Sequence, residues 1–131
     1  MQYNSISMEK KRPKHLDLMK IRLPLPGWVS ILHRISGAVL FLFIPFLLWL
    51  LQASLGSAET YAGFKSALAS PLVKLILFGL VWAFLHHFFA GIRYLALDMH
   101  LGIELGPARA SSTAVLIASI VLTLLIGVRL W

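Results

Sequence analysis

Residues 38–51 read A-V-L-F-L-F-I-P-F-L-L-W-L-L, an unbroken apolar run. With its flanking residues, this run predicts a helix over 28–52, and ~20 apolar residues suffice to cross the hydrocarbon core of a bilayer. Trp28 and Trp49 stand near the two ends, where interfacial aromatic residues belong. Pro45 predicts a kink, which membrane helices tolerate when neighbouring groups satisfy the freed carbonyl. The stretch therefore predicts a membrane-spanning helix.

The composition of the whole chain agrees with a membrane protein. Of 131 residues, 59% are hydrophobic and 13% are charged, and the mean hydropathy is +0.83. Soluble domains carry about 45–50% apolar and about 25% charged residues. The chain has no cysteine, which excludes disulfides and cysteine-ligated iron–sulfur clusters within it.

Two further apolar segments predict spans over 71–97 and 113–131. Ser70-Pro71 is a helix start signal for the second span, and the segment 53–70 before it is expected to be a loop. The third span is preceded by Gly106-Pro107, which predicts a turn, and by two candidate capping residues, Ser111 and Ser112. We therefore expect an all-α membrane protein with three transmembrane helices in a single domain, residues 1–131.

Charge predicts the orientation of these spans. Residues 1–22 hold six basic residues against two acidic ones, so the basic segment 1–27 is expected in the cytoplasm by the positive-inside rule. The loop 53–70 then lies outside and the loop 98–112 inside. Because the basic segment directly precedes a predicted span, its positive charge is better explained by membrane topology than by nucleic-acid binding. The first apolar run is longer than the 7–15 residues of a signal peptide, so we expect no cleavage.

The second span ends in a polar stretch, L-H-H-F-F-A-G-I-R-Y-L-A-L-D at 85–98. A helix turns about 100° per residue, so this stretch divides into two faces. One face holds His87, Gly91, Tyr94 and Asp98, and the other holds His86 and Arg93. Adjacent histidines on a helix do not face each other, so a metal site made from His86 and His87 together is not expected.

His87 has two interpretations on the residues alone. It can hydrogen-bond to another helix, or it can ligate haem, because polar groups inside a membrane are costly and commonly functional. Gly91 one turn later removes a side chain that would obstruct a flat macrocycle, but it also suits close helix packing. Both interpretations stay open at this point, and His86 keeps the simpler, structural one.

A second polar group, S-I-L-H-R-I-S-G at 30–37, lies in the first span. Ser30, Arg34 and Gly37 share one face, and His33 shares another with Gly37. Arg34 can extend to the interface, and Ser30 can bond to its own helix backbone. Both groups lie in the cytoplasmic half of the predicted bundle. Their cations suit a cofactor with an anionic tail or an amphipathic headgroup.

Four motifs carry a resemblance to a known family. They are R-P-K-H-L-D-L at 12–18, I-R-L-P at 21–24, S-I-L-H-R-I-S-G at 30–37 and H-x-x-x-G-I-R-x-x-x-x-D at 87–98. Together they resemble the cytochrome b subunits of succinate dehydrogenases, with the proteobacterial form as the nearest match. The resemblance covers nearly the whole chain.

The resemblance implies an anchor in the bacterial inner membrane for a flavoprotein subunit and an iron–sulfur subunit. A second hydrophobic anchor subunit would complete the helical bundle. Electrons from succinate, released in the tricarboxylic acid cycle, would pass to ubiquinone. One haem b would lie between the two anchors, with one axial histidine from each.

The resemblance also implies roles for particular residues. His87 corresponds to the axial ligand of the haem iron, and Ser30 and Arg34 correspond to the quinone-binding serine and arginine. His33 and Arg93 are expected near the haem propionates. Tyr94 stands where many members have a second histidine, so the chain departs from the family there. The second axial ligand is expected from the partner chain.

Other functions compete with this interpretation. Fumarate reductases use related anchors. A small transporter or channel subunit without a cofactor could use His86, His87 and Arg93 as a polar path, and a purely structural anchor would use none of them. The third span offers few polar residues, Ser119, Thr123 and Arg129, which argues against a channel.

Overall fold

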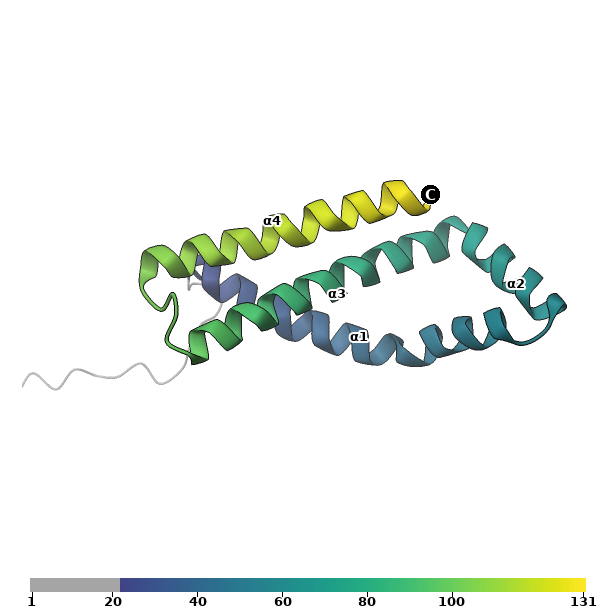
Figure 1. The fold of residues 1–131 in the computed structure, drawn as a ribbon, viewed down its shortest axis with the longest axis horizontal. Coiled ribbons are helices and arrows are strands. Elements are labelled where there is room, and N and C mark those ends of the chain that lie inside the picture. Colours follow the sequence, from purple (N-terminus) through teal and green to yellow (C-terminus); the bar gives the residue numbers. More distant parts are fainter. Residues whose placement is uncertain (1–21) are drawn as a thin grey trace, which may run out of the picture.

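Three long helices and one short one make up the computed structural model, which describes residues 22–131 (Figure 1). The helices are α1 (Leu25–Leu55), α2 (Ala58–Ala69), α3 (Pro71–Asp98) and α4 (Leu105–Leu130). The R-P-K-H-L-D-L motif and most of the predicted basic segment lie outside the described residues. Each long helix is long and apolar enough to cross a membrane. The prediction of an all-α membrane protein with three transmembrane helices is confirmed.

Helix α1 extends beyond the predicted span at both ends. It is 31 residues long, or about 46 Å at 1.5 Å per residue. Pro24 is its N-cap residue, and a further proline lies in the first turn, where a missing N–H costs no hydrogen bond. The helix continues through Pro45.

The segment 53–70 was expected to be a loop, and this expectation is wrong, because it contains α2. The helix is fixed at its start by a capping box between Ser57 and Thr60. The Ser57 hydroxyl oxygen accepts from the Thr60 backbone N–H at 3.2 Å, and the Thr60 hydroxyl accepts from the Ser57 N–H at 2.7 Å. Glu59 adds a negative charge in the first turn, which favours the helix dipole.

Helix α3 begins at the predicted Ser70-Pro71 signal, although the Ser70 side chain makes no capping bond. It ends in a Schellman motif. The N–H of Leu101 donates to the Ala96 carbonyl and that of His100 to the Leu97 carbonyl, both at 2.9 Å. His100 occupies the left-handed position of this motif with φ 62°, a position that glycine usually takes.

Helix α4 begins eight residues before the predicted span, at Leu105. The predicted turn at Gly106-Pro107 is wrong, because both residues lie in the first helical turn, where proline is tolerated. Ser111 and Ser112 are therefore not caps. The Ser112 hydroxyl instead donates to the Ala108 carbonyl one turn earlier, at 2.7 Å.

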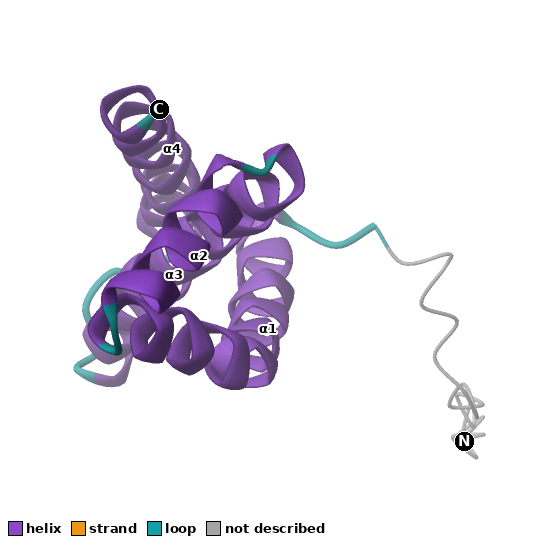
Figure 2. Ribbon diagram, turned by 90° about the vertical axis from the view of Figure 1, so that its right-hand side faces the viewer, coloured by secondary structure: helices purple, strands orange, loops and turns teal. Residues whose placement is uncertain are grey.

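Helix α3 lies between α1 and α4 and packs along both of them (Figures 1 and 2). The three helices meet around a small core of Val29, Ala90 and Val115. Many large apolar side chains elsewhere are exposed, as expected of helices that face lipid or other membrane subunits. The start of α1, the end of α3 and the start of α4 lie at the same end of the bundle (Figure 1).

Candidate functional site

Two histidines from different helices stack on each other at this end of the bundle. The imidazole of His33 on α1 lies nearly parallel to that of His87 on α3, with ring centroids 4.2 Å apart and an interplanar angle of 15°. Both residues were candidate site residues on sequence grounds. The structure places them in direct contact.

The protonation of the His87 ring follows from its neighbours. Its Nδ1 atom lies 3.0 Å from the His33 carbonyl oxygen and 3.3 Å from the Ser36 hydroxyl oxygen. The Ser36 hydroxyl donates to the same carbonyl at 2.9 Å. A carbonyl can only accept, so Nδ1 carries the proton and donates it. In the neutral form of the ring, Nε2 then keeps its lone pair, which is the arrangement in which a histidine binds a metal.

Glycine at position 37 is what allows this contact. A Cβ atom there would lie 2.8 Å from Cε1 of His87, which is closer than carbon atoms approach without a shift. The sequence analysis assigned Gly91 a different role, making room for a macrocycle or for close helix packing, and this stays a prediction. A Cβ at position 91 would meet only Nε2 of His33, at 3.8 Å, so the surrounding protein atoms do not require glycine there.

Tyr94 extends the pair into a column of three rings. Its ring centroid lies 5.2 Å from that of His33, at an interplanar angle of 40°. Tyr94 and His87 come from the same face of α3, as predicted from their spacing, and His33 of α1 lies against both. We refer to His33, His87 and Tyr94, with Ser36 and Gly37, as the His87 site.

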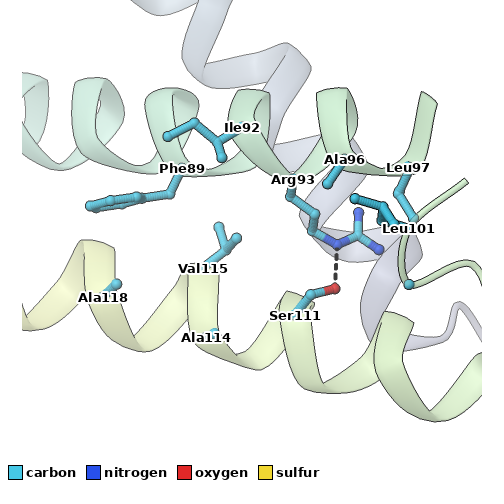
Figure 3. Close-up of a pocket in the computed structure, with 11 residues that line it drawn as sticks. Phe89, Ile92, Arg93, Ala96, Leu97, Leu101, Ser111, Ala114, Val115 and Ala118 are labelled. Atoms are coloured by element: carbon cyan, nitrogen blue, oxygen red, sulfur yellow. Dashed lines mark hydrogen bonds between the residues drawn. The ribbon is translucent and has the colours of Figure 1, made fainter. Parts of the chain in front are cut away.

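The structure does not bring Arg93 to His87. The Arg93 side chain points to α4, where Nε donates to the Ser111 hydroxyl at 3.0 Å (Figure 3) and Nη2 donates to the Ala108 carbonyl at 3.5 Å. The guanidinium also lies 5.6 Å from the centroid of the Tyr94 ring. Arg93 is thus next to the column of rings but turned away from the His87 imidazole.

Ser30 and Arg34 lie one turn apart on α1, as their spacing predicted. Ser30 is half-buried and Arg34 is exposed. Arg34 directly follows His33 in the chain. The two residues are therefore next to the His87 site without being part of the stacked rings.

His86 is turned away from this site, as the two-face analysis predicted. Its side chain is 0% exposed and stacks on Trp82 with centroids 5.3 Å apart. Neither ring nitrogen has a hydrogen-bond partner within residues 22–131. The two adjacent histidines do not form a joint chelate.

Ser36 is the functional neighbour that sequence reasoning missed. It lies in the S-I-L-H-R-I-S-G motif, one turn after His33, so it shares a face with His33. That spacing was the available signal. Its contact with a histidine 51 positions later could not be found from the motif, because it depends on how α1 crosses α3.

The described residues contain no group of three or more histidine, cysteine, aspartate or glutamate side chains that could hold a bare metal ion. A ligand set made only of protein side chains is therefore absent from residues 22–131. A metal held by one histidine needs a cofactor or a second chain to supply its other ligands.

Comparison with known proteins identifies relatives over most of the chain. Residues 8–126 match the family described as "Succinate dehydrogenase/Fumarate reductase transmembrane subunit". The succinate dehydrogenase cytochrome b556 subunit of Coxiella burnetii is 38% identical over 125 residues, which is 95% of this chain and 100% of the relative. The subunit of the same name from Paracoccus denitrificans is 37% identical over 114 residues, 87% of this chain and 88% of the relative.

A more distant relative carries a related name. The succinate dehydrogenase 2 membrane subunit of Mycobacterium tuberculosis is 32% identical over 115 residues, covering 81% of each chain. All of these relatives match the chain along most of their length. The similarity therefore concerns the whole membrane domain and not one motif.

Proposed function

The chain belongs to the succinate dehydrogenase/fumarate reductase transmembrane subunit family, and from this premise we propose that it is the cytochrome b anchor of a succinate dehydrogenase, with His87 as an axial ligand of haem b. The relatives named cytochrome b556 subunits support the presence of a b-type haem. The geometry of the His87 site supports the choice of ligand.

The observation that carries this proposal is the contact between Nδ1 of His87 and the His33 carbonyl oxygen at 3.0 Å. Histidines that ligate metals almost always donate the other ring N–H to a carbonyl, carboxylate or water, which orients the ring and raises its basicity. His87 has this partner in place, with Nε2 left to bind iron. His86 has no such partner within residues 22–131.

The residues present fit a haem. A b-type haem takes axial histidines and needs only one from this chain if a partner supplies the other. Bound haem passes single electrons between its ferric and ferrous states. The side chains of this chain orient the axial imidazole through Ser36 and the His33 carbonyl and hold it within the membrane.

We propose that side chains around the His87 site contact the haem propionates. His33 stacks on His87 and lies against Tyr94. The His33 and Tyr94 rings are therefore positioned to contact the polar edge of a macrocycle bound at His87. Arg93 is proposed as a third contact, as its motif position predicts. Its guanidinium would have to leave Ser111 to make this contact.

Ser30 and Arg34 are proposed to bind the quinone, with ubiquinone as the substrate. Arg34 is exposed, so its cation is available to stabilise the negative charge that develops on a quinone oxygen during reduction. Ser30, one turn away, can hydrogen-bond to the headgroup. Their position beside His33 would keep quinone and haem close together.

Partners follow from the same family. We propose that the chain anchors a flavoprotein subunit and an iron–sulfur subunit, and that a second hydrophobic anchor subunit supplies the other axial ligand. The exposed apolar faces of the helices support a membrane partner. We propose that this end of the bundle lies at the cytoplasmic face of the bacterial inner membrane, an orientation that the basic N-terminal segment supports.

The physiological direction of the reaction has two candidates, because the matched family includes fumarate reductases. We favour succinate oxidation, because the relatives described above carry the succinate dehydrogenase name. The ratio of succinate–quinone to quinol–fumarate activity in the purified complex decides between the two.

The haem proposal is tested with the complex purified through a tag on this chain. The reduced-minus-oxidised spectrum should show a b-type absorbance that His87→Ala removes and His86→Ala retains. Immunoblotting of the partner subunits shows whether each variant still assembles. A spectrum that survives His87→Ala and disappears in His86→Ala would assign the ligand to His86.

A further inference from the structure

A groove between α3 and α4 adjoins Arg93 at the end of the bundle that holds the His87 site. It has a volume of about 290 Å³ and is lined mostly by apolar side chains from both helices. Figure 3 shows Phe89 and Ile92 on one wall and Val115 and Ala118 on the other. Arg93 lies between this part of the groove and the part lined by Ala96, Leu97 and Leu101. The groove is thus mostly apolar, with one cationic side chain in its wall.

Arg93 keeps a positive charge and unused donors at that end. Its side chain is only 7% exposed, and its two described hydrogen bonds go to neutral oxygens, of Ser111 and Ala108. Within residues 22–131, the only fully buried side-chain nitrogens without a partner are those of His86. The Nη1 atom of Arg93 makes no described bond and is not among these fully buried atoms, so it is not fully covered.

The depth of Arg93 matches the headgroup region of a bilayer. It lies five residues before the end of α3, about 7.5 Å along the helix axis, and beside the first turns of α4. Asp98 is about 140° further around α3 and so faces away from Arg93. From this point the groove continues toward the middle of the membrane past Ile92 and Phe89, and toward the end of α3 past Ala96 and Leu97.

We propose that this groove binds one acyl chain of an anionic phospholipid, with the lipid phosphate held by Arg93. Arginine presents several N–H donors in a planar fork that matches phosphate oxygens. Basic pockets between transmembrane helices at the membrane surface are sites for anionic headgroups. Acyl chains are suited to the apolar walls. In the conformation that the structure shows, Arg93 faces α4 and this groove, and the propionate contact proposed above would require it to turn away from Ser111.

Native mass spectrometry of the purified complex tests this site. The complex is exchanged into phosphatidylglycerol or phosphatidylcholine, and the lipids that remain bound are counted. Wild-type protein should retain one more phosphatidylglycerol than Arg93→Gln, with an affinity difference of about tenfold or more, since hydrogen bonds to charged groups are the strong ones. Arg109→Gln, an exposed cation at the same end of α4, should change retention less than twofold.

A second pair of variants tests the groove without changing charge. Ala118→Leu fills the groove and should release the lipid as Arg93→Gln does, whereas Ala110→Leu, on the exposed surface of α4, should not. If Arg93→Gln does not assemble, this pair alone decides the question. Equal retention by Ala118→Leu and Ala110→Leu overturns the proposal.

Two other outcomes also overturn it. Displacement of the lipid by inorganic phosphate at millimolar concentration would show an anion site with no role for the acyl chain. A changed haem spectrum in Arg93→Gln, with unchanged lipid retention, would assign Arg93 to the propionates instead.

Discussion

The carbonyl oxygen of His33 lies 3.0 Å from Nδ1 of His87, although the two residues are 54 positions apart in the chain. The backbone of α1 thereby sets the orientation of a side chain on α3. The His33 ring then covers one face of the His87 ring. A displacement of α1 along α3 would alter both contacts, so the properties of the site depend on the packing of these two helices.

Gly37→Ala should disturb this packing. The added Cβ would lie 2.8 Å from Cε1 of His87, and overpacking of this kind costs about 1–3 kcal/mol. We expect a lower haem content and a lower melting temperature of the complex. Gly79→Ala on α3 is the control, because a Cβ there meets nothing within 4 Å. Identical haem content in both variants would contradict the structural role of Gly37.

His86→Phe should be tolerated or stabilising. The His86 ring is fully buried with both nitrogens unpartnered within residues 22–131, and an unsatisfied buried polar group costs about 1–3 kcal/mol. Phenylalanine keeps a flat ring against Trp82 without that cost. We expect an unchanged b-type spectrum and an equal or higher melting temperature. A lower melting temperature would contradict the cost assigned here to the unpartnered nitrogens.

Two substitutions in the turn after α3 should change the stability of the protein in opposite directions. His100→Gly should stabilise the protein by about 1 kcal/mol. His100 has φ 62°, and this left-handed backbone conformation is unfavourable for a residue with a Cβ atom. Gly102→Ala should destabilise it by a similar amount, since Gly102 has φ 74°. Thermal denaturation of the two variants measures the difference. Stabilisation by Gly102→Ala would contradict the turn geometry.

Arg34→Gln should separate quinone reduction from haem binding. Removing a donor that stabilises developing negative charge lowers turnover by about tenfold or more, while the haem spectrum should remain, because Arg34 is not part of the stacked rings. Succinate–quinone reductase assays and spectra of the same preparation measure both. Arg129→Gln, at the far end of α4, is the matched control. Loss of haem in Arg34→Gln but not in Arg129→Gln would assign Arg34 to the haem propionates instead of the quinone.

Local sequence patterns were enough to predict the long helices and the two faces of α3. Apolar length decides which segments cross the membrane, and the 100° turn per residue separates His86 from His87 whatever surrounds them. The errors were the missed helix α2 and the ends of the long helices. The capping box of α2 involves only Ser57 and Thr60, but the segment is too short and polar for an apolar pattern to reveal it. Proline at position 107 predicts a turn, yet the first turn of a helix accepts it equally well.

The sequence by itself determined that this is a three-helix membrane protein with its polar residues gathered at one end, because hydrophobic length and helical periodicity are local properties. Only the tertiary structure decided which groups meet. The His33 carbonyl holds His87, Gly37 makes room for the His87 ring, and Arg93 turns to Ser111. These contacts depend on the register and crossing of α1, α3 and α4, which the packing of side chains from distant segments sets, and no local pattern encodes that register.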